Sequence, residues 1–173
     1  LRTVYPEVRV NGVVADFTRD LHRVRSNSSK LVLFLGSTIG NLDEHEALSF
    51  LCEVAGMLNP GDRFLLGLDM IKPVSILEAA YNDSQDVTSE FNKNILHVLN
   101  RELHANFSPE DFDHVAFFNH EEERVEMHLR ARRDLRVEIK ALHTSITLRK
   151  GETIRTEICR KFTRDRAKHM IRD

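Results

Sequence analysis

The chain has 173 residues, a formal net charge of −2, 41% hydrophobic side chains and 30% charged ones. This balance is typical of a globular domain and excludes a disordered chain, and the near-neutral charge argues against a nucleic-acid binder with a broad basic surface. No apolar run is long enough to cross a bilayer, so we expect no membrane partner. Cys52 and Cys159 fit neither a disulfide framework nor a zinc motif, which indicates free thiols in a reducing cytoplasm.

The first 72 residues alternate strand-like and helix-like segments. Residues 10–16 are interpreted as a strand, and the apolar runs at 30–36 and 63–70 as strands covered on both faces. Between the last two, apolar residues recur at helical spacing from 47 to 58. A strand, a helix and a strand joined by short links pair in parallel, so this part is predicted to be one edge of a doubly wound α/β sheet.

The second half has a different pattern. Residues 74–104 have helical periodicity, and Ser108 resembles the cap of a further short helix. From 114 to 162 the period falls to two, which predicts antiparallel strands joined by polar turns. Residues 162–173 begin like a strand and continue as an amphipathic helix. Because the chain lacks an initiator methionine and stops without a closing strand, we expect it to be a fragment of a longer protein.

The most unusual stretch is "GSTIGN" at residues 36–41, directly after a predicted strand. In open α/β sheets, ligands bind beyond the carboxyl ends of the strands, where glycines let a ligand approach the backbone. Ser37, Thr38 and Asn41 offer donors and acceptors there, and Asp16 can accept from an adenine amine or a ribose hydroxyl. The same residues also fit a structural role, with Asn41 and Asp16 as helix caps and the hydroxyls in a turn. The pattern alone therefore leaves ligand binding open.

Several long motifs, in order along almost the whole chain, carry a family resemblance: "LVLFLGSTIGNLDEHEALSFL", "GDRFLLGLDMIKPVSILEAAYND", "VTSEFNKNILHVLNREL" and "GETIRTEICRKF". The sequence resembles the histidine-specific Nα-methyltransferase family of ergothioneine biosynthesis. That family consists of class I enzymes that use S-adenosyl-L-methionine to trimethylate the α-amino group of L-histidine, giving hercynine. The resemblance implies a Rossmann-like methyl-donor core in residues 1–72, a substrate-recognition insert of helices and antiparallel strands in 73–161, and a truncated return to the core in 162–173.

The resemblance also implies which residues hold the methyl donor. Asp16 and Phe17 match the positions that hold its adenine, and Gly36 and Ser37 match a loop close to both the donor and the substrate. An amine that attacks a sulfonium methyl group in line needs mainly to be positioned, so no residue is assigned a catalytic role. No histidine or cysteine spacing indicates a metal site.

The substrate residues are carried over in the same way. Gly36, Asn41 and Tyr81 match residues near the substrate, the last two at its carboxylate, while Met127 and Glu157 match the side-chain pocket, with Glu157 pairing with the imidazole. A buried carboxylate without a partner penalises a substrate that lacks the ring. Where the family usually has serine, two positions after that glutamate, this chain has Cys159. A thiol is the weaker hydrogen-bonding group, so imidazole binding is expected to weaken if Cys159 faces the ring.

Other interpretations remain open. The parent enzyme can act on another amino acid because of Cys159, or the chain can be a non-catalytic ligand-binding module of the same fold. Nucleic-acid binding through the basic stretch 130–136 is the weakest hypothesis, because alternation places its arginines on both faces of a strand. We expect L-histidine as the partner and a monomeric parent. The fragment should be inactive without the glycine-rich donor loop, and its exposed edges favour self-association.

Overall fold

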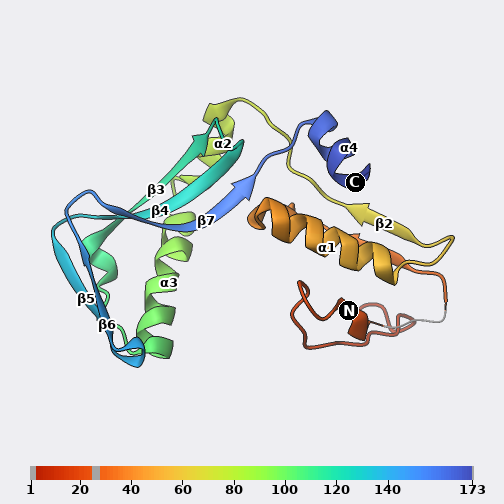
Figure 1. Ribbon diagram of the computed structural model, residues 1–173, viewed down its shortest axis with the longest axis horizontal. Coiled ribbons are helices and arrows are strands. Elements are labelled where there is room, and N and C mark those ends of the chain that lie inside the picture. The colour runs from red at the N-terminus through yellow and green to blue at the C-terminus, as the bar shows by residue number, and fades with distance from the viewer. Residues whose placement is uncertain (1–2, 25–27, 173) are drawn as a thin grey trace.

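The computed structural model describes residues 3–24 and 28–172, which form helices and three small sheets in an α/β arrangement (Figure 1). One part, formed by the beginning and end of the chain, contains a parallel strand pair, and the other is an insert with antiparallel sheets. The elements are η1 (Leu21–Arg23), β1 (Leu31–Phe34), η2 (Thr38–Asn41), α1 (Glu44–Met57), β2 (Arg63–Leu66), α2 (Val74–Tyr81), α3 (Val87–Leu103), η3 (Pro109–Asp111), β3 (Phe112–Asn119), β4 (Arg124–Ala131), β5 (Leu135–Ile139), η4 (Lys140–Leu142), β6 (Thr144–Leu148), β7 (Thr153–Arg160) and α4 (Arg164–Arg172).

The parallel part consists of β1 and β2 with α1 against one face. The two strands pair in parallel from Leu31 opposite Arg63 to Phe34 opposite Leu66, as predicted from the strand–helix–strand pattern. The inward residues of both strands pack with Phe50 of α1 in one apolar cluster. The rings of Phe34 and Phe50 lie 4.4 Å apart between centroids. This cluster fixes the orientation of the loop that follows β1.

The prediction that these two strands are buried on both faces is wrong for the described structure. Leu31, Leu33 and Leu65 are 63%, 54% and 53% exposed, whereas the alternate residues face α1. A strand places successive side chains on opposite faces, and among the described elements a helix covers only one of them. The second face is therefore an exposed row of leucines.

Two further expectations for this part are corrected. Residues 10–16 are not a strand: they are irregular, and the Asp16 carbonyl accepts from the amide N–H groups of Arg19 and Asp20 in a turn. A strand needs a partner to satisfy its backbone groups, and the described parallel sheet has two strands. The cap of α1 is Asp43 rather than Asn41, because Asp43 and Glu46 form a reciprocal capping box.

The insert confirms the predicted helices and antiparallel strands. Helices α2 and α3 pack against the sheet β3–β4–β7 through two apolar clusters, one around Leu96 and Phe112, the other around Leu77 and Phe118 (Figure 1). Strands β5 and β6 form a separate hairpin. The helix expected after Ser108 is only the 3₁₀ turn η3, and the Ser108 hydroxyl donates to Glu110 instead of capping it.

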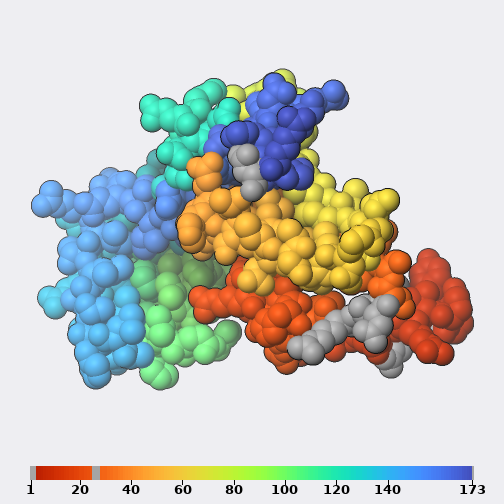
Figure 2. All heavy atoms as spheres, turned by 45° about the vertical axis from the view of Figure 1, so that its right-hand side comes forward, coloured from red at the N-terminus to blue at the C-terminus, as the bar shows by residue number. Residues whose placement is uncertain are grey.

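Strand β7 connects the insert to the parallel part. Beyond its end, Phe162 forms a single parallel bridge with Met70, so the strand expected at 162 is one residue pair, and the predicted amphipathic helix α4 follows. Helix α4 lies next to α1 (Figure 2), and residues of both helices line a cavity of about 200 Å³. In the described part of the chain, no helix is both long and apolar enough to cross a membrane.

Candidate functional site

The loop after β1 turns sharply at two consecutive residues with positive φ. Gly36 has a φ of 79° and Ser37 a φ of 59°, a conformation that side chains other than glycine adopt at a cost of about 1 kcal/mol. The buried Ser37 hydroxyl accepts from the amide N–H of Asp69 at 2.9 Å, which ties the loop to the segment after β2. The carboxyl ends of both parallel strands are thereby fixed next to each other.

Helix η2 packs directly on strand β7. A Cβ atom at Gly40 would lie only 2.8 Å from the backbone oxygen of Arg160, so glycine permits this approach. The next residue, Asn41, donates through Nδ2 to Oε1 of Glu157 at 2.7 Å. These two side chains are 116 residues apart in sequence, and both were expected at a substrate site.

One face of β7 carries several polar side chains in alternation. Residues 157, 159 and 161 point to the same side of the extended chain. Met127 of β4 lies opposite Glu157 in the antiparallel ladder, so these two side chains share that face, and Met127 is buried. The structure therefore places Met127, Glu157 and Cys159 on one face of two neighbouring strands, and their role in binding the substrate's side chain stays a prediction.

Lys161 was not singled out in the sequence, yet it joins three of the surrounding elements. Its ammonium donates to the Tyr81 hydroxyl at 2.9 Å and to Sγ of Cys159 at 3.2 Å, and it lies 3.0 Å from Oδ2 of Asp69. These groups, the glycine loop and residues 67–69 line an open cavity of about 340 Å³. The sequence signal that could have revealed Lys161 is the alternation of Glu157, Cys159 and Lys161, which puts the three side chains on one face of a strand.

Burial and charge set the protonation of this cluster. Burial raises the pKa of Tyr81 to about 12, reinforced by Cys159 and opposed by Lys161, so its hydroxyl stays protonated. Burial alone lowers the pKa of Lys161, but its contacts with Tyr81, Cys159 and Asp69 leave that pKa above the usual value. For Asp69, desolvation is outweighed by Lys72 and Lys161, which lower its pKa. At neutral pH the cluster therefore contains a charged lysine, a charged aspartate and a neutral phenol.

Asp16 and Phe17 lie on a different surface of the parallel part. The Phe17 ring packs 5.5 Å from Phe34 and 5.9 Å from Phe50 between centroids, beside β1 and α1. Oδ1 of Asp16 accepts from the hydroxyl and the amide N–H of Thr18, and these two bonds, the hydroxyl bond most of all, lower the pKa of Asp16. Neither residue lines the cavity next to Gly36.

The sequence of the whole chain matches one family model. That model, described as a histidine-specific, S-adenosylmethionine-dependent methyltransferase, matches residues 1–173. The chain belongs to this family.

Individual relatives agree with the methyltransferase family. The histidine N-alpha-methyltransferases of Mycolicibacterium smegmatis and Mycobacterium tuberculosis are each 44% identical over 158 residues, which is 91% of this chain and 49% of theirs. Ergothioneine biosynthesis protein 1 of Schizosaccharomyces pombe is 33% identical over 123 residues, 68% of this chain and 16% of its own length. The chain thus spans about half the length of the two bacterial relatives.

The loop at Gly36 and the separate surface around Phe17 were both predicted to contact S-adenosylmethionine, on which the family's enzymes depend. A Cβ atom placed on Gly36 would meet only Thr38 Oγ1, at 3.8 Å, so the backbone here is open to a ligand. The exposed Phe17 ring offers an apolar surface for a base, but Asp16 already uses one carboxylate oxygen in its turn. Among the described residues, no group of three or more histidine, cysteine or acidic side chains could hold a metal ion.

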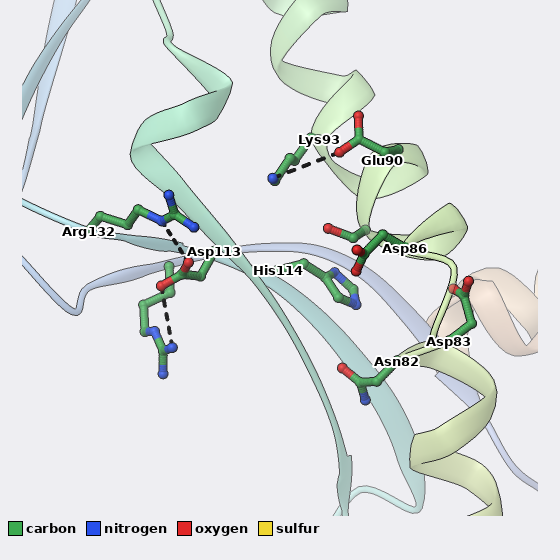
Figure 3. Close-up of a pocket in the computed structure, with 10 residues that line it drawn as sticks. Asn82, Asp83, Asp86, Glu90, Lys93, Asp113, His114 and Arg132 are labelled. Carbon is green, nitrogen blue, oxygen red and sulfur yellow. Dashed lines mark hydrogen bonds and ion pairs between the residues drawn. The ribbon is translucent and has the colours of Figure 1, made fainter.

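A larger cavity of about 510 Å³ lies elsewhere in this methyltransferase chain, between α2, α3, β3 and β4 (Figure 3). Several of its charged side chains already have protein partners. Asp113 forms an ion pair with Arg132 at 2.7 Å, and Asp83 accepts hydrogen bonds from the backbone at the start of α3. It shares no lining residue with the cavity beside Gly36. Although this cavity is the larger of the two, its charged groups already have protein partners, so we do not assign the functional site to it.

Proposed function

We propose that the complete gene product containing this chain transfers methyl groups from S-adenosyl-L-methionine to the α-amino group of L-histidine, giving hercynine. The observation that carries this proposal is the 2.7 Å hydrogen bond between Asn41 and Glu157, which joins the two side chains that we propose bind the carboxylate and the imidazole of one substrate. The printed names of the relatives, histidine N-alpha-methyltransferase and ergothioneine biosynthesis protein 1, support the same reaction.

Asn41 and Tyr81 hold the carboxylate of the amino acid in this proposal. An amide nitrogen has two N–H donors, and only one is needed for Glu157, so the other can point to the substrate. The Tyr81 hydroxyl is protonated, since its pKa is raised to about 12 by burial, and it can donate as well. Asn41 comes from η2, which packs on β7, and Tyr81 comes from α2, which packs on β3 and β4 of the same sheet, so this sheet fixes the separation of the two donors.

Glu157, Met127 and Cys159 form the side-chain pocket. Glu157 keeps its second oxygen for an imidazole N–H while the first accepts from Asn41. The buried Met127 lies opposite Glu157 in the ladder and supplies an apolar wall. A substrate without a ring N–H would leave the second oxygen of Glu157 without a partner, and that penalty selects for histidine.

The methyl donor is proposed to bind at the carboxyl ends of β1 and β2. S-adenosyl-L-methionine supplies the electrophilic methyl group, and this chain positions the amine beside it. Gly36 and Ser37 would approach the donor, with Asp16 and Phe17 at its adenine. The parallel pair and its uncovered leucine face support a doubly wound, Rossmann-like core, because such sheets carry helices on both faces.

The proposed domain organisation follows from the same arrangement. Residues 1–72 belong to the donor-binding core, 73–161 form the substrate-recognition insert, and 162–173 return to the core. The bridge between Phe162 and Met70, which attaches the end of the chain beside β2, supports this division. Its consequence is that L-histidine is held by residues from both parts, whereas the proposed donor residues all lie in the core.

A different amino acid is the second candidate substrate. Cys159 contacts Lys161 at 3.2 Å, and a thiol beside an ammonium offers little to an imidazole nitrogen. The pocket then relies on Glu157 alone for the ring, which reduces its preference for histidine.

One experiment separates these candidates. The complete gene product is incubated with S-adenosyl-L-methionine and an equimolar mixture of the common amino acids, and mass spectrometry follows which one gains three methyl groups. We expect L-histidine alone to be trimethylated, and Glu157→Gln to lower kcat/KM for it by about 10- to 100-fold. Glu53→Gln, an exposed carboxylate on α1, is the control and should leave the rate unchanged. Trimethylation of another amino acid, or of none, contradicts the proposal.

A further inference from the structure

Lys161 is the most deeply buried charged residue next to the cavity. Its exposed fraction is 0%, and each of its three N–H donors has a partner from a different element: Asp69 after β2, Tyr81 at the end of α2, and Cys159 in β7. A buried charge is costly unless it is paired and fully hydrogen-bonded. The Lys161 ammonium meets this condition, because it is paired with Asp69 and hydrogen-bonded to Tyr81 and Cys159.

Lys161 determines the hydrogen-bonding role of Tyr81. An ammonium only donates, so the Tyr81 oxygen must accept at the 2.9 Å contact, and the phenol proton has to point elsewhere. Nζ also lies 4.9 Å from the centre of the Tyr81 ring, which holds the ring in place from a second direction. The protein group near this proton is the Cys159 thiol, a weak acceptor. A carboxylate in the cavity would be the stronger acceptor.

The local charge points to the same ligand chemistry. Asp69 is the carboxylate next to Lys161, but it is shared with Lys72, whose Nζ lies 2.7 Å from its other oxygen. Two ammonium groups around one carboxylate leave a positive charge beside the cavity. Lys161 is the buried member of this trio, so solvent screens its charge least.

We propose that Lys161 is a positioning residue for the α-carboxylate of the substrate: it fixes Tyr81 as a donor that faces the cavity and supplies the positive potential behind it. This inference rests on the proposed function for the identity of the substrate. It goes beyond that function in assigning the orientation of Tyr81 to a residue that does not itself need to touch the ligand.

A double-mutant cycle in the complete gene product tests the inference. Affinity for L-histidine is measured by isothermal titration calorimetry for the wild type, Lys161→Met, Tyr81→Phe and the double variant, with thermal unfolding of each as the check on folding. We expect Lys161→Met to weaken binding about tenfold or more, and to have less than a threefold effect once Tyr81 is phenylalanine. Phenylalanine keeps the ring under Nζ and removes only the hydroxyl.

The control is Lys150→Met, which removes an exposed ammonium from the turn before β7 without touching Tyr81 or Asp69, and should change affinity less than twofold. If Lys161→Met does not fold, the same cycle is run with Lys161→Arg, which keeps a charge on Asp69 but displaces the donor, and an at least threefold loss confined to the Tyr81 background is expected. Wild-type affinity in the Lys161 variants, or an equal loss of affinity with and without the Tyr81 hydroxyl, overturns the inference.

The same titrations distinguish failure of the inference from failure of the proposed function. If the wild type binds another amino acid instead of L-histidine, the proposed function fails, and the cycle with that amino acid decides on Lys161, because the α-carboxylate is common to both. If the wild type binds no amino acid, both proposals fail.

Discussion

Cys159 differs from the serine expected at its position by one atom, and the structure gives that atom two neighbours. Its sulfur accepts from Lys161 at 3.2 Å and faces the Tyr81 hydroxyl. A hydroxyl is a stronger donor and acceptor than a thiol. Replacing Cys159 by serine should therefore strengthen hydrogen bonding in the proposed imidazole pocket.

We expect Cys159→Ser to lower the KM for L-histidine in the complete gene product by about 2- to 10-fold, the equivalent of one hydrogen bond of about 0.5–1.5 kcal/mol. Steady-state kinetics with L-histidine measure it. Cys52→Ser, at an exposed position on α1, is the matched control and should leave KM as it is. A KM that rises in Cys159→Ser would show that the thiol is better suited to the ring than a hydroxyl.

The residues of the site were predictable from the sequence to different degrees. Asn41, Tyr81 and Glu157 were predicted from the family resemblance. They lie on η2, α2 and β7, and no local sequence pattern predicts that these three elements come together. Lys161 was not predicted as a site residue, because a lysine at the end of a strand is usually exposed to solvent. It is buried here since Asp69, far away in sequence, supplies its counter-charge.

At the scale of elements, the contact between η2 and β7 holds the site together. Gly40→Ala would place a Cβ atom 2.8 Å from the Arg160 carbonyl oxygen, where only backbone can give way. The variant should lose about 1–3 kcal/mol of unfolding free energy, as for other overpacked contacts, and bind L-histidine more weakly because Asn41 moves with η2. Urea unfolding and calorimetric titration of the complete gene product measure the two effects.

Gly56→Ala is the matched control for this substitution. Gly56 lies in α1 with nothing within 4 Å of an added Cβ atom, so alanine should stabilise the helix by up to about 1 kcal/mol and leave binding unchanged. Equal stability changes in the two variants would mean that the close approach of η2 to β7 is not tight in solution.

The elements themselves were predicted best where their pattern needs no distant partner. The amphipathic helix α3 and the alternating strands β3, β4 and β7 lie where the periodicity indicated. Residues 10–16 alternate too weakly to form a strand without a neighbour, and they end in the turn at Asp16. The prediction that β1 is buried on both faces was wrong for a similar reason: whether a strand's second face is buried depends on another element packing on it, and the strand's own sequence does not supply that element.

At the scale of the molecule, the row of exposed leucines on β1 and β2 is an apolar surface that none of the described helices covers. Leu31, Leu33 and Leu65 lie on one face of two paired strands, next to each other in register. Single exposed apolar residues are common, but a contiguous apolar patch usually marks an interaction surface. In a doubly wound sheet such a face is covered, which is why it supports the proposed core.

The 173-residue chain expressed alone should therefore self-associate through this face. Sedimentation velocity should show association that increases with protein concentration, and the double substitution Leu33→Thr and Leu65→Thr should reduce it, because threonine suits a strand but removes most of the apolar area. Leu142→Thr, an equally exposed leucine on η4, is the control and should leave association unchanged. A chain that stays monomeric at all concentrations would contradict the prediction. Association that Leu142→Thr reduces equally would mean that the interface does not lie on the leucine face of β1 and β2.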